Sequence, residues 1–108
     1  MAKYLLIESR DPFDSVDSQY FAELVQGLAK RGNEATVFLV QNGVLPARKG
    51  SKYSTVIADL VKSKVKVVAD RFSLKERGIR QLVDGVDTAD TDRLVDLLVE
   101  PGIKAIWH

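Results

Sequence analysis

The sequence contains no cysteine, and this absence excludes more chemistry than any other feature of its composition. Without a thiol the chain can form no disulfide bond, no zinc-thiolate site and no cysteine persulfide. The absence of disulfide bonds also fits a reducing compartment. His108 is the only histidine, so we expect no metal site built from histidine and cysteine side chains. We also assign no cofactor.

A long hydrophobic run and an excess of one charge are missing as well. No apolar run approaches the roughly 18 residues that cross a bilayer. The N-terminal segment MAKYLLIES has no small-residue cleavage site and is typical of a first strand. Sixteen basic and 15 acidic residues leave a formal charge of +1, which is too small to attract nucleic acid or a membrane surface. We therefore expect a cytoplasmic protein that binds neither.

What the sequence does contain is an alternation of short apolar runs with segments of helical period. Such an alternation is typical of a parallel sheet that helices cover on both faces. It predicts a single domain, residues 1–108, in the α/β class, with three layers (α/β/α), flavodoxin-like layering and a mostly parallel sheet of about five strands. The expected strands are Tyr4–Ile7, Ala35–Val40, Val65–Ala69 and Ile103–Trp107, with at most a brief strand near Val86. The expected main helices are Asp17–Arg31, Ser51–Ser63 and Asp90–Val99.

The spacing within two of these helices predicts which side chains face the core. In the first helix, Phe21, Leu24, Val25 and Leu28 follow the spacing of one helical face. In the last helix, we expect three side chains to face inward: Leu94, Val95 and Leu98.

Polar residues follow the expected strands at their carboxyl ends. In open parallel sheets, ligands bind beyond these ends, so this edge is the expected place for any binding site. The candidate ligand-binding residues are Arg10, Asp11, Asn42, Gly43, Asp70 and Arg71. In this arrangement Arg10, Asn42 and Arg71 contact an anion, and backbone amides at Gly43 assist.

Three segments together resemble the DsrE/DsrF-like (DsrEFH-like) family of small sulfur-relay proteins. Val65–Ile79, VKVVADRFSLKERGI, is similar to the signature segment of the family, in which a short helix ending in Arg-Gly follows a strand. Val37–Val44, VFLVQNGV, is similar to a strand that runs into a Gly-Val loop, and Lys104–Trp107 to a closing strand that ends in Trp. The resemblance implies the DsrEFH-like fold, a homo-oligomer (trimer or hexamer) and protein partners from a sulfur-relay system.

The sequence departs from this family at the reactive position. The family has a cysteine seven residues before the Arg of the Arg-Gly ending, and here Asp70 stands seven residues before Arg77. The resemblance implies that the cysteine carries a persulfide, a task that requires a thiolate. A carboxylate cannot accept a sulfane sulfur, so we assign no catalytic residue. We interpret Asp70 as a solvated helix cap and Arg77 as a cation at a helix end. Ser73 is also expected to cap the short helix, in a capping box with Glu76.

Other patterns carry less weight. The string Lys49–Lys52 does not match a phosphate loop, because Gly43 lies seven residues before Gly50. A triad of Ser15, Asp11 and His108 would draw on mobile segments, His108 among them, and lacks an elbow motif.

Two apolar features of the sequence suggest packing. Trp107 is expected to pack in the core or in an interface. Leu45 and Pro46 are apolar within a polar loop and suggest a subunit contact.

Three functional hypotheses follow. The favoured one is a non-catalytic oligomeric scaffold or partner-binding protein related to intracellular sulfur relay. The second is a protein that binds a small anionic ligand in the crevice at the carboxyl ends of the strands. The third is an enzyme in which Asp70 is the general acid or base.

Overall fold

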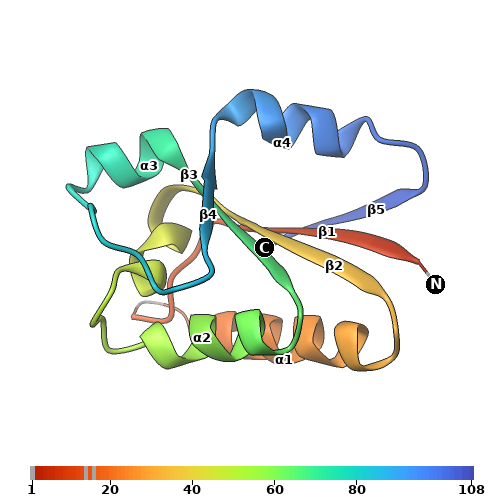
Figure 1. Ribbon diagram of the computed structural model, residues 1–108, viewed down its shortest axis with the longest axis horizontal. Helices are drawn as coiled ribbons and strands as arrows, with labels where there is room; N and C mark the ends of the chain where they lie inside the picture. Colours follow the sequence, from red (N-terminus) through yellow and green to blue (C-terminus); the bar gives the residue numbers. More distant parts are fainter. Residues whose placement is uncertain (1, 14, 16) are drawn as a thin grey trace.

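The computed structural model describes residues 2–13, 15 and 17–108, and a five-stranded sheet lies at its centre (Figure 1). All four strand pairs are parallel, and the strand order is β4-β3-β2-β1-β5. The strands are β1 (Lys3–Glu8), β2 (Glu34–Leu39), β3 (Lys66–Asp70), β4 (Asp87–Ala89) and β5 (Ile103–Trp107). The helices are α1 (Asp17–Lys30), the 3-10 helix η1 (Gln41–Ala47), α2 (Ser54–Lys62), α3 (Arg71–Glu76) and α4 (Thr91–Leu98). The predicted α/β architecture is confirmed.

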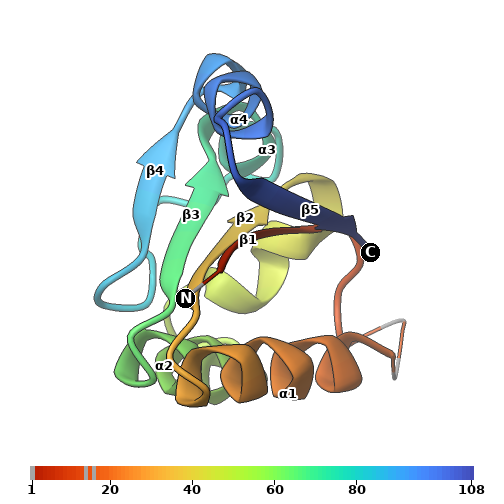
Figure 2. The ribbon, with the colours of Figure 1, turned by 90° about the vertical axis from the view of Figure 1, so that its right-hand side faces the viewer.

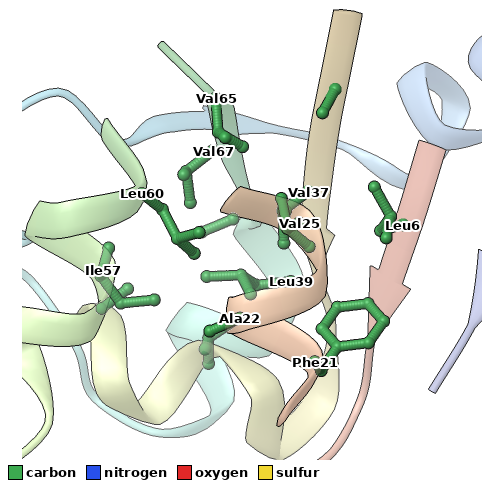
Figure 3. Packing of buried hydrophobic residues seen from close by; sticks show 14 of the residues in the cluster. Leu6, Phe21, Ala22, Val25, Val37, Leu39, Ile57, Leu60, Val65 and Val67 are labelled. Carbon is green, nitrogen blue, oxygen red and sulfur yellow. The ribbon is translucent and has the colours of Figure 1, made fainter. Parts of the chain in front are cut away.

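Helices cover both faces of the sheet (Figure 2). One hydrophobic cluster joins β1, β2 and β3 to α1 and α2, with Val25 and Ile57 among its buried members (Figure 3). A second cluster lies on the opposite face, where Leu94 and Leu97 of α4 pack on the sheet. Because the central strands are buried on both faces, their side chains are apolar without alternation.

The structure corrects part of the predicted helix packing. In α1, Phe21 and Val25 are buried as expected, but Leu24 is exposed. In α4, Leu94 is buried as expected, whereas Val95 and Leu98 are exposed and Leu97 is buried in their place. The apolar stripe of each helix is wider than the part that the sheet covers. The spacing therefore identifies the apolar side of a helix, but not which flank remains in contact with solvent.

The segment predicted as a loop after β2 forms η1 and packs inward. Val44, Pro46 and Ala47 are buried, and Leu45 packs against the same core cluster. The inference of a subunit contact from Leu45 and Pro46 was therefore wrong, because these side chains contact their own core. The homo-oligomer itself stays a prediction.

The edge strand β5 is largely exposed. Trp107 is 64% exposed on β5, so the interpretation of Trp107 as a core residue was wrong for the isolated subunit. A large aromatic side chain at the end of an edge strand has no neighbouring strand to cover it.

In the described part of the chain, no helix has both the length and the apolar character needed to span a membrane.

Candidate functional site

The carboxyl ends of the parallel strands bring two polar clusters to one edge of the sheet. The first cluster surrounds Asp70, the last residue of β3, and includes residues of η1 and α3. The second surrounds Glu8, the last residue of β1, and includes His108, which follows β5. Each cluster contains a buried carboxyl group.

Asp70 caps α3 from a buried position. Its backbone is extended (φ −66°, ψ 123°), and its Oδ2 accepts from the N–H of Ser73 (3.0 Å) and from the Ser73 hydroxyl (2.6 Å). Asp70 is only 6% exposed. Its other oxygen, Oδ1, has no hydrogen-bond partner among the described residues. The predicted helix cap at Asp70 is present, although the residue is buried and not solvated.

The predicted capping box of Ser73 with Glu76 was wrong. The helix begins at Arg71, directly after Asp70, so Ser73 is its third residue. The third residue is the one whose N–H a capping side chain reaches. Ser73 therefore receives the cap and does not provide it.

Ser73 also connects α3 to η1. Its hydroxyl oxygen accepts from the N–H of Gln41 (2.8 Å), and its carbonyl oxygen accepts from Nη1 of Arg77 (3.1 Å). Arg77 Nε donates to Oδ1 of Asn42 (3.1 Å). Arg77 lies at the end of α3, as predicted, and its guanidinium joins α3 to η1. Asn42 is therefore held by Arg77 within the fold.

Arg71 makes a separate, exposed contact. Its Nη1 lies 2.9 Å from Oδ1 of Asp90, and its Nη2 donates to Thr88 Oγ1 (3.3 Å). The Arg71 and Asp90 side chains are 58% and 68% exposed. Such an exposed pair contributes about 0–1 kcal/mol.

The second cluster includes a residue pair that sequence reasoning missed. Nδ1 of His108 lies 2.9 and 2.8 Å from the two carboxylate oxygens of Glu8, whose side chain is 7% exposed. Burial raises the pKa of Glu8, and hydrogen bonds from the Arg10 N–H and His108 oppose this rise in part. The His108 ring stacks on Phe21, with centroids 5.0 Å apart. The expectation that His108 is flexible was wrong, because its ring and backbone are both held.

Arg10 and Asp11 lie in the loop that follows Glu8, and only Arg10 contacts the pair. The N–H of Arg10 donates to Glu8 (2.9 Å). Asp11 is buried, and its Oδ1 accepts from the N–H of Phe13 (2.7 Å). His108 pairs with Glu8, so the structure does not assemble the triad of Ser15, Asp11 and His108. Asp11 therefore fixes the loop after β1.

Gly43 brings η1 against the end of β1. A Cβ atom at this position would lie 2.1 Å from the carbonyl oxygen of Glu8, so only glycine fits. Its N–H donates to Val40 O (2.9 Å) and is therefore used within the turn. Glycine at this position is required by the close approach of two chain segments.

A small cavity lies between α1, α2 and the sheet beside Glu8. Its volume is about 30 Å³, and Glu8, Arg10, Ser18 and Gly43 are among its lining residues. The hydroxyl of Ser18 is buried and has no hydrogen-bond partner among the described residues. A volume of this size holds about one or two water molecules. Of the predicted ligand-binding residues, only Arg10 and Gly43 line it, while Arg71 lines a separate hollow beside α3.

Residues 11–102 match the family model described as DsrH-like protein. The chain belongs to the DsrH-like family. This family is part of the DsrEFH-like group, so the resemblance recognised in the sequence is confirmed, and the membership relates the chain to sulfur-relay proteins. No curated protein matches the sequence significantly.

Solved structures share the fold of this DsrH-like chain at low sequence identity. The YchN protein from E. coli is 20% identical, with a TM-score of 0.85 and coverage of 98% of this chain and 100% of YchN. Protein MTH1491 from Methanobacterium thermoautotrophicum, titled as of unknown function, is 21% identical, with a TM-score of 0.84 and full coverage of both chains. BT1422 from Bacteroides thetaiotaomicron, also titled as of unknown function, is 15% identical, with a TM-score of 0.78 and coverage of 98% and 94%. At these identities the likeness establishes the fold alone.

The DsrH-like match includes the segment around Asp70 but not β1 or His108. The Glu8–His108 pair therefore lies outside the matched residues. The only signal for it in the sequence is a charged residue, Glu8, at the end of an otherwise apolar strand. In the described part of the chain, no cluster of three or more metal-ligating side chains is present.

Proposed function

We propose that this DsrH-like chain is a non-catalytic, self-associating, partner-binding protein that acts beside intracellular sulfur relay without carrying sulfur itself. The observation that carries the proposal is the structural role of Asp70. At the position of the family cysteine, the chain has a buried carboxylate that caps α3 and binds Ser73. The sequence of 108 residues offers no thiol elsewhere.

The surroundings of Asp70 support this interpretation. Ser73, Gln41, Asn42 and Arg77 form a hydrogen-bonded network that joins η1 to α3. Ser73 is buried within this network, whereas Gln41 and Asn42 are exposed. A network of this kind rigidifies the end of the strand and does not present a reacting group to a substrate. The retained fold is then available as a surface for protein partners.

The two alternative hypotheses receive less support. An anionic ligand requires free cations around a cavity, yet Arg71 and Arg77 both bind groups of their own chain. The cavity beside Arg10 has a volume of about 30 Å³, which is too small for an organic anion unless side chains move. A general acid or base at Asp70 requires access to a substrate, and this carboxyl group is buried beneath α3.

The absence of sulfur transfer is tested with a sulfane-sulfur donor and intact mass spectrometry. We expect no sulfur adduct on the wild-type chain. The Asp70→Cys variant should gain a reducible adduct in proportion to the exposure of its thiol, with Asp90→Cys as a control for an exposed cysteine outside the family position. An adduct on the wild-type chain would contradict the proposal.

Self-association is tested separately by sedimentation velocity at micromolar concentration. We expect a species larger than the 12.0 kDa chain. A single species of chain mass at all concentrations would rule out the self-associating part of the proposal.

A further inference from the structure

Strand β5 forms one edge of the sheet and leaves part of its backbone without a neighbouring strand (Figure 2). His108, directly after this strand, donates its N–H to β1 (2.8 Å), and its carbonyl oxygen accepts an N–H from the segment after β1 (3.4 Å). Both backbone groups of His108 therefore point toward β1. Because this direction alternates from one residue to the next, the N–H and C=O groups of Ile103, Ala105 and Trp107 point outward.

Exposed apolar side chains gather around this open edge. Nine large apolar side chains are exposed in the described part of the chain; six of them belong to β5, α1 or α4, and a seventh, Val99, directly follows α4. We call these seven residues the β5 patch: Tyr20, Leu24, Val95, Leu98, Val99, Ile106 and Trp107. Exposed apolar side chains on a monomer that gather beside an open strand edge indicate an interaction surface.

One α1 member of the patch, Leu24, lies on the flank of α1 that faces away from α2. Gln19, Glu23 and Gln26 line a cleft with α2, whereas helical spacing places Leu24 across the buried stripe from them and Tyr20 on the outer side of the helix. In Figure 2, α1 lies on the β5 side of α2. The flank that carries Leu24 is therefore directed to the β5 edge.

The α4 members lie on the other face of the sheet. Leu94 and Leu97 of α4 pack on the sheet, and helical spacing places Leu98 on the flank beside Leu94, with Val95 and Val99 farther from the sheet. The chain continues from α4 into β5 through a short turn. Both helical layers thus carry exposed apolar side chains.

The strand itself connects the two layers. Trp107 lies beside Ile7 on the face that α4 covers, and Ile106 lies beside Leu6 on the face that α1 covers. The only charged side chain within β5 is Lys104, whose Nζ lies 5.7 Å from the ring centroid of Tyr4. The lysine therefore extends over the sheet face. In this position it hinders the pairing of β5 with another strand less than a lysine directed outward would.

We propose that β5 pairs in antiparallel orientation with β5 of a second copy of this chain, across a two-fold axis at Ala105. Ala105 lies opposite Ala105 of the second copy, and Ile103 lies opposite Trp107. This register joins the outward N–H and C=O groups of all three residues and makes the two five-stranded sheets continuous. The inference rests on the proposed function, because it names the partner in the self-association.

A second copy fits this edge better than an unrelated strand does. The outward-facing residues are symmetric about Ala105, as an isologous interface requires. A two-fold axis perpendicular to the sheet keeps each face on its own side, so α1 meets α1 and α4 meets α4. The apolar flanks are then buried against their own copies. The patch side chains nearest the edge, Leu24, Leu98, Ile106 and Trp107, expose on the order of a few hundred Å², which is part of the roughly 800 Å² per partner of a stable interface.

The experiment is disulfide trapping, for which the cysteine-free chain provides a clean background. In the proposed register, the Cα atoms of the two Ala105 residues lie about 5.5 Å apart, within the range of a disulfide. Ala105→Cys should therefore form a linked dimer under mild oxidation. Thr88→Cys, on the opposite edge strand, is the matched control. We expect linking of Ala105→Cys to be on the order of 100-fold faster, because the effective concentration in the dimer is millimolar.

A second trap tests the register. A mixture of Ile103→Cys and Trp107→Cys should form the mixed dimer faster than either variant links to itself. Failure of Ala105→Cys to link, in a protein that sediments above 12.0 kDa, would overturn the β5 pairing and leave the proposed function intact. A wild-type chain that stays monomeric would overturn both the pairing and the self-association. Uptake of sulfur by the wild-type chain would overturn the proposed function alone.

Discussion

The two polar clusters at the carboxyl edge of the sheet both contain a buried carboxyl group. They differ in how far apart in the sequence the bonded residues lie. Asp70 binds Ser73, three residues further along the chain. Glu8 binds His108, 100 residues away. The first is a local helix cap, which residue types and spacing can reveal. The second depends on β1 and β5 being neighbours, which no local pattern specifies.

This difference explains which parts of the structure the sequence predicts. The alternation of apolar runs and helical periods predicts the α/β fold and most of its elements, because each strand and helix leaves a local pattern. Asp70 as a helix cap is predicted for the same reason. The exposure of Trp107 and the fixed position of His108 depend on strand order, with β5 at the edge beside β1. The core position of Trp107 and the flexibility of His108 were therefore predicted wrongly, while packing of Trp107 in an interface stays a prediction.

The two edges of the sheet differ in a similar way. Strand β4 has only three residues, Asp87–Ala89, and Asp84 and Asp90 flank it. Short strands and charges are the means by which proteins prevent edge pairing. Strand β5 has five residues, no proline, and an exposed Trp107. The contrast between the protected edge and the open edge supports the proposed association through β5.

The largest expected loss of stability comes from a substitution that pushes η1 away from the Glu8 cluster. In Gly43→Ala, the new Cβ atom would lie 2.1 Å from the carbonyl oxygen of Glu8, so the backbone must shift. We expect a loss of about 3 kcal/mol in the free energy of unfolding, measured by urea denaturation. Gly27→Ala is the control, because nothing lies within 4 Å of its added Cβ and alanine stabilises a helix interior by about 0.5–1 kcal/mol. Equal stabilities of the two variants would contradict the tight contact.

The next largest loss of stability is expected when the Glu8–His108 pair is removed. Glu8→Ala leaves the Arg10 N–H and the His108 ring without their acceptor, and we expect a loss of about 2 kcal/mol. Glu23→Ala, an exposed site on α1, is the control and should change the free energy of unfolding by less than about 0.5 kcal/mol.

The same pair predicts a dependence on pH. Because burial raises the pKa of Glu8 above 4.5 in the folded state, the folded protein binds the proton more tightly than the unfolded chain does. The contribution of Glu8 to stability is then fully present below pH 4.5 and is lost as the pH rises through the folded pKa. The difference in unfolding free energy between wild type and Glu8→Gln should shift in favour of wild type on acidification. The opposite slope would show that the pairing with His108 outweighs burial.

A smaller effect is expected at the Asp70 cap. Asp70→Ala removes the acceptor for the N–H and hydroxyl of Ser73, which should cost about 1–2 kcal/mol. Asp70→Asn keeps an oxygen that can cap the helix and should recover part of this loss. Chemical denaturation of both variants measures the difference. If alanine and asparagine were equally destabilising, Asp70 would have a role other than capping.

The smallest effect is expected at the exposed end of the same cluster. Arg71→Ala removes the contacts with Asp90 and Thr88, which solvent screens. We expect a change of less than about 0.5 kcal/mol. A loss comparable to that of Asp70→Ala would mean that the two positions are coupled, and a double-mutant cycle would measure that coupling.

The most direct test of the account is the fluorescence of Trp107, the only tryptophan in the chain. In the isolated subunit its side chain is 64% exposed, and in the β5-paired dimer it is buried opposite Ile103. We predict that its emission shifts to shorter wavelength as the wild-type protein is concentrated through the micromolar range. The shift should be absent in Ala105→Pro, which removes an outward N–H from the edge. Emission typical of solvent-exposed tryptophan at every concentration would contradict β5 as the associating surface.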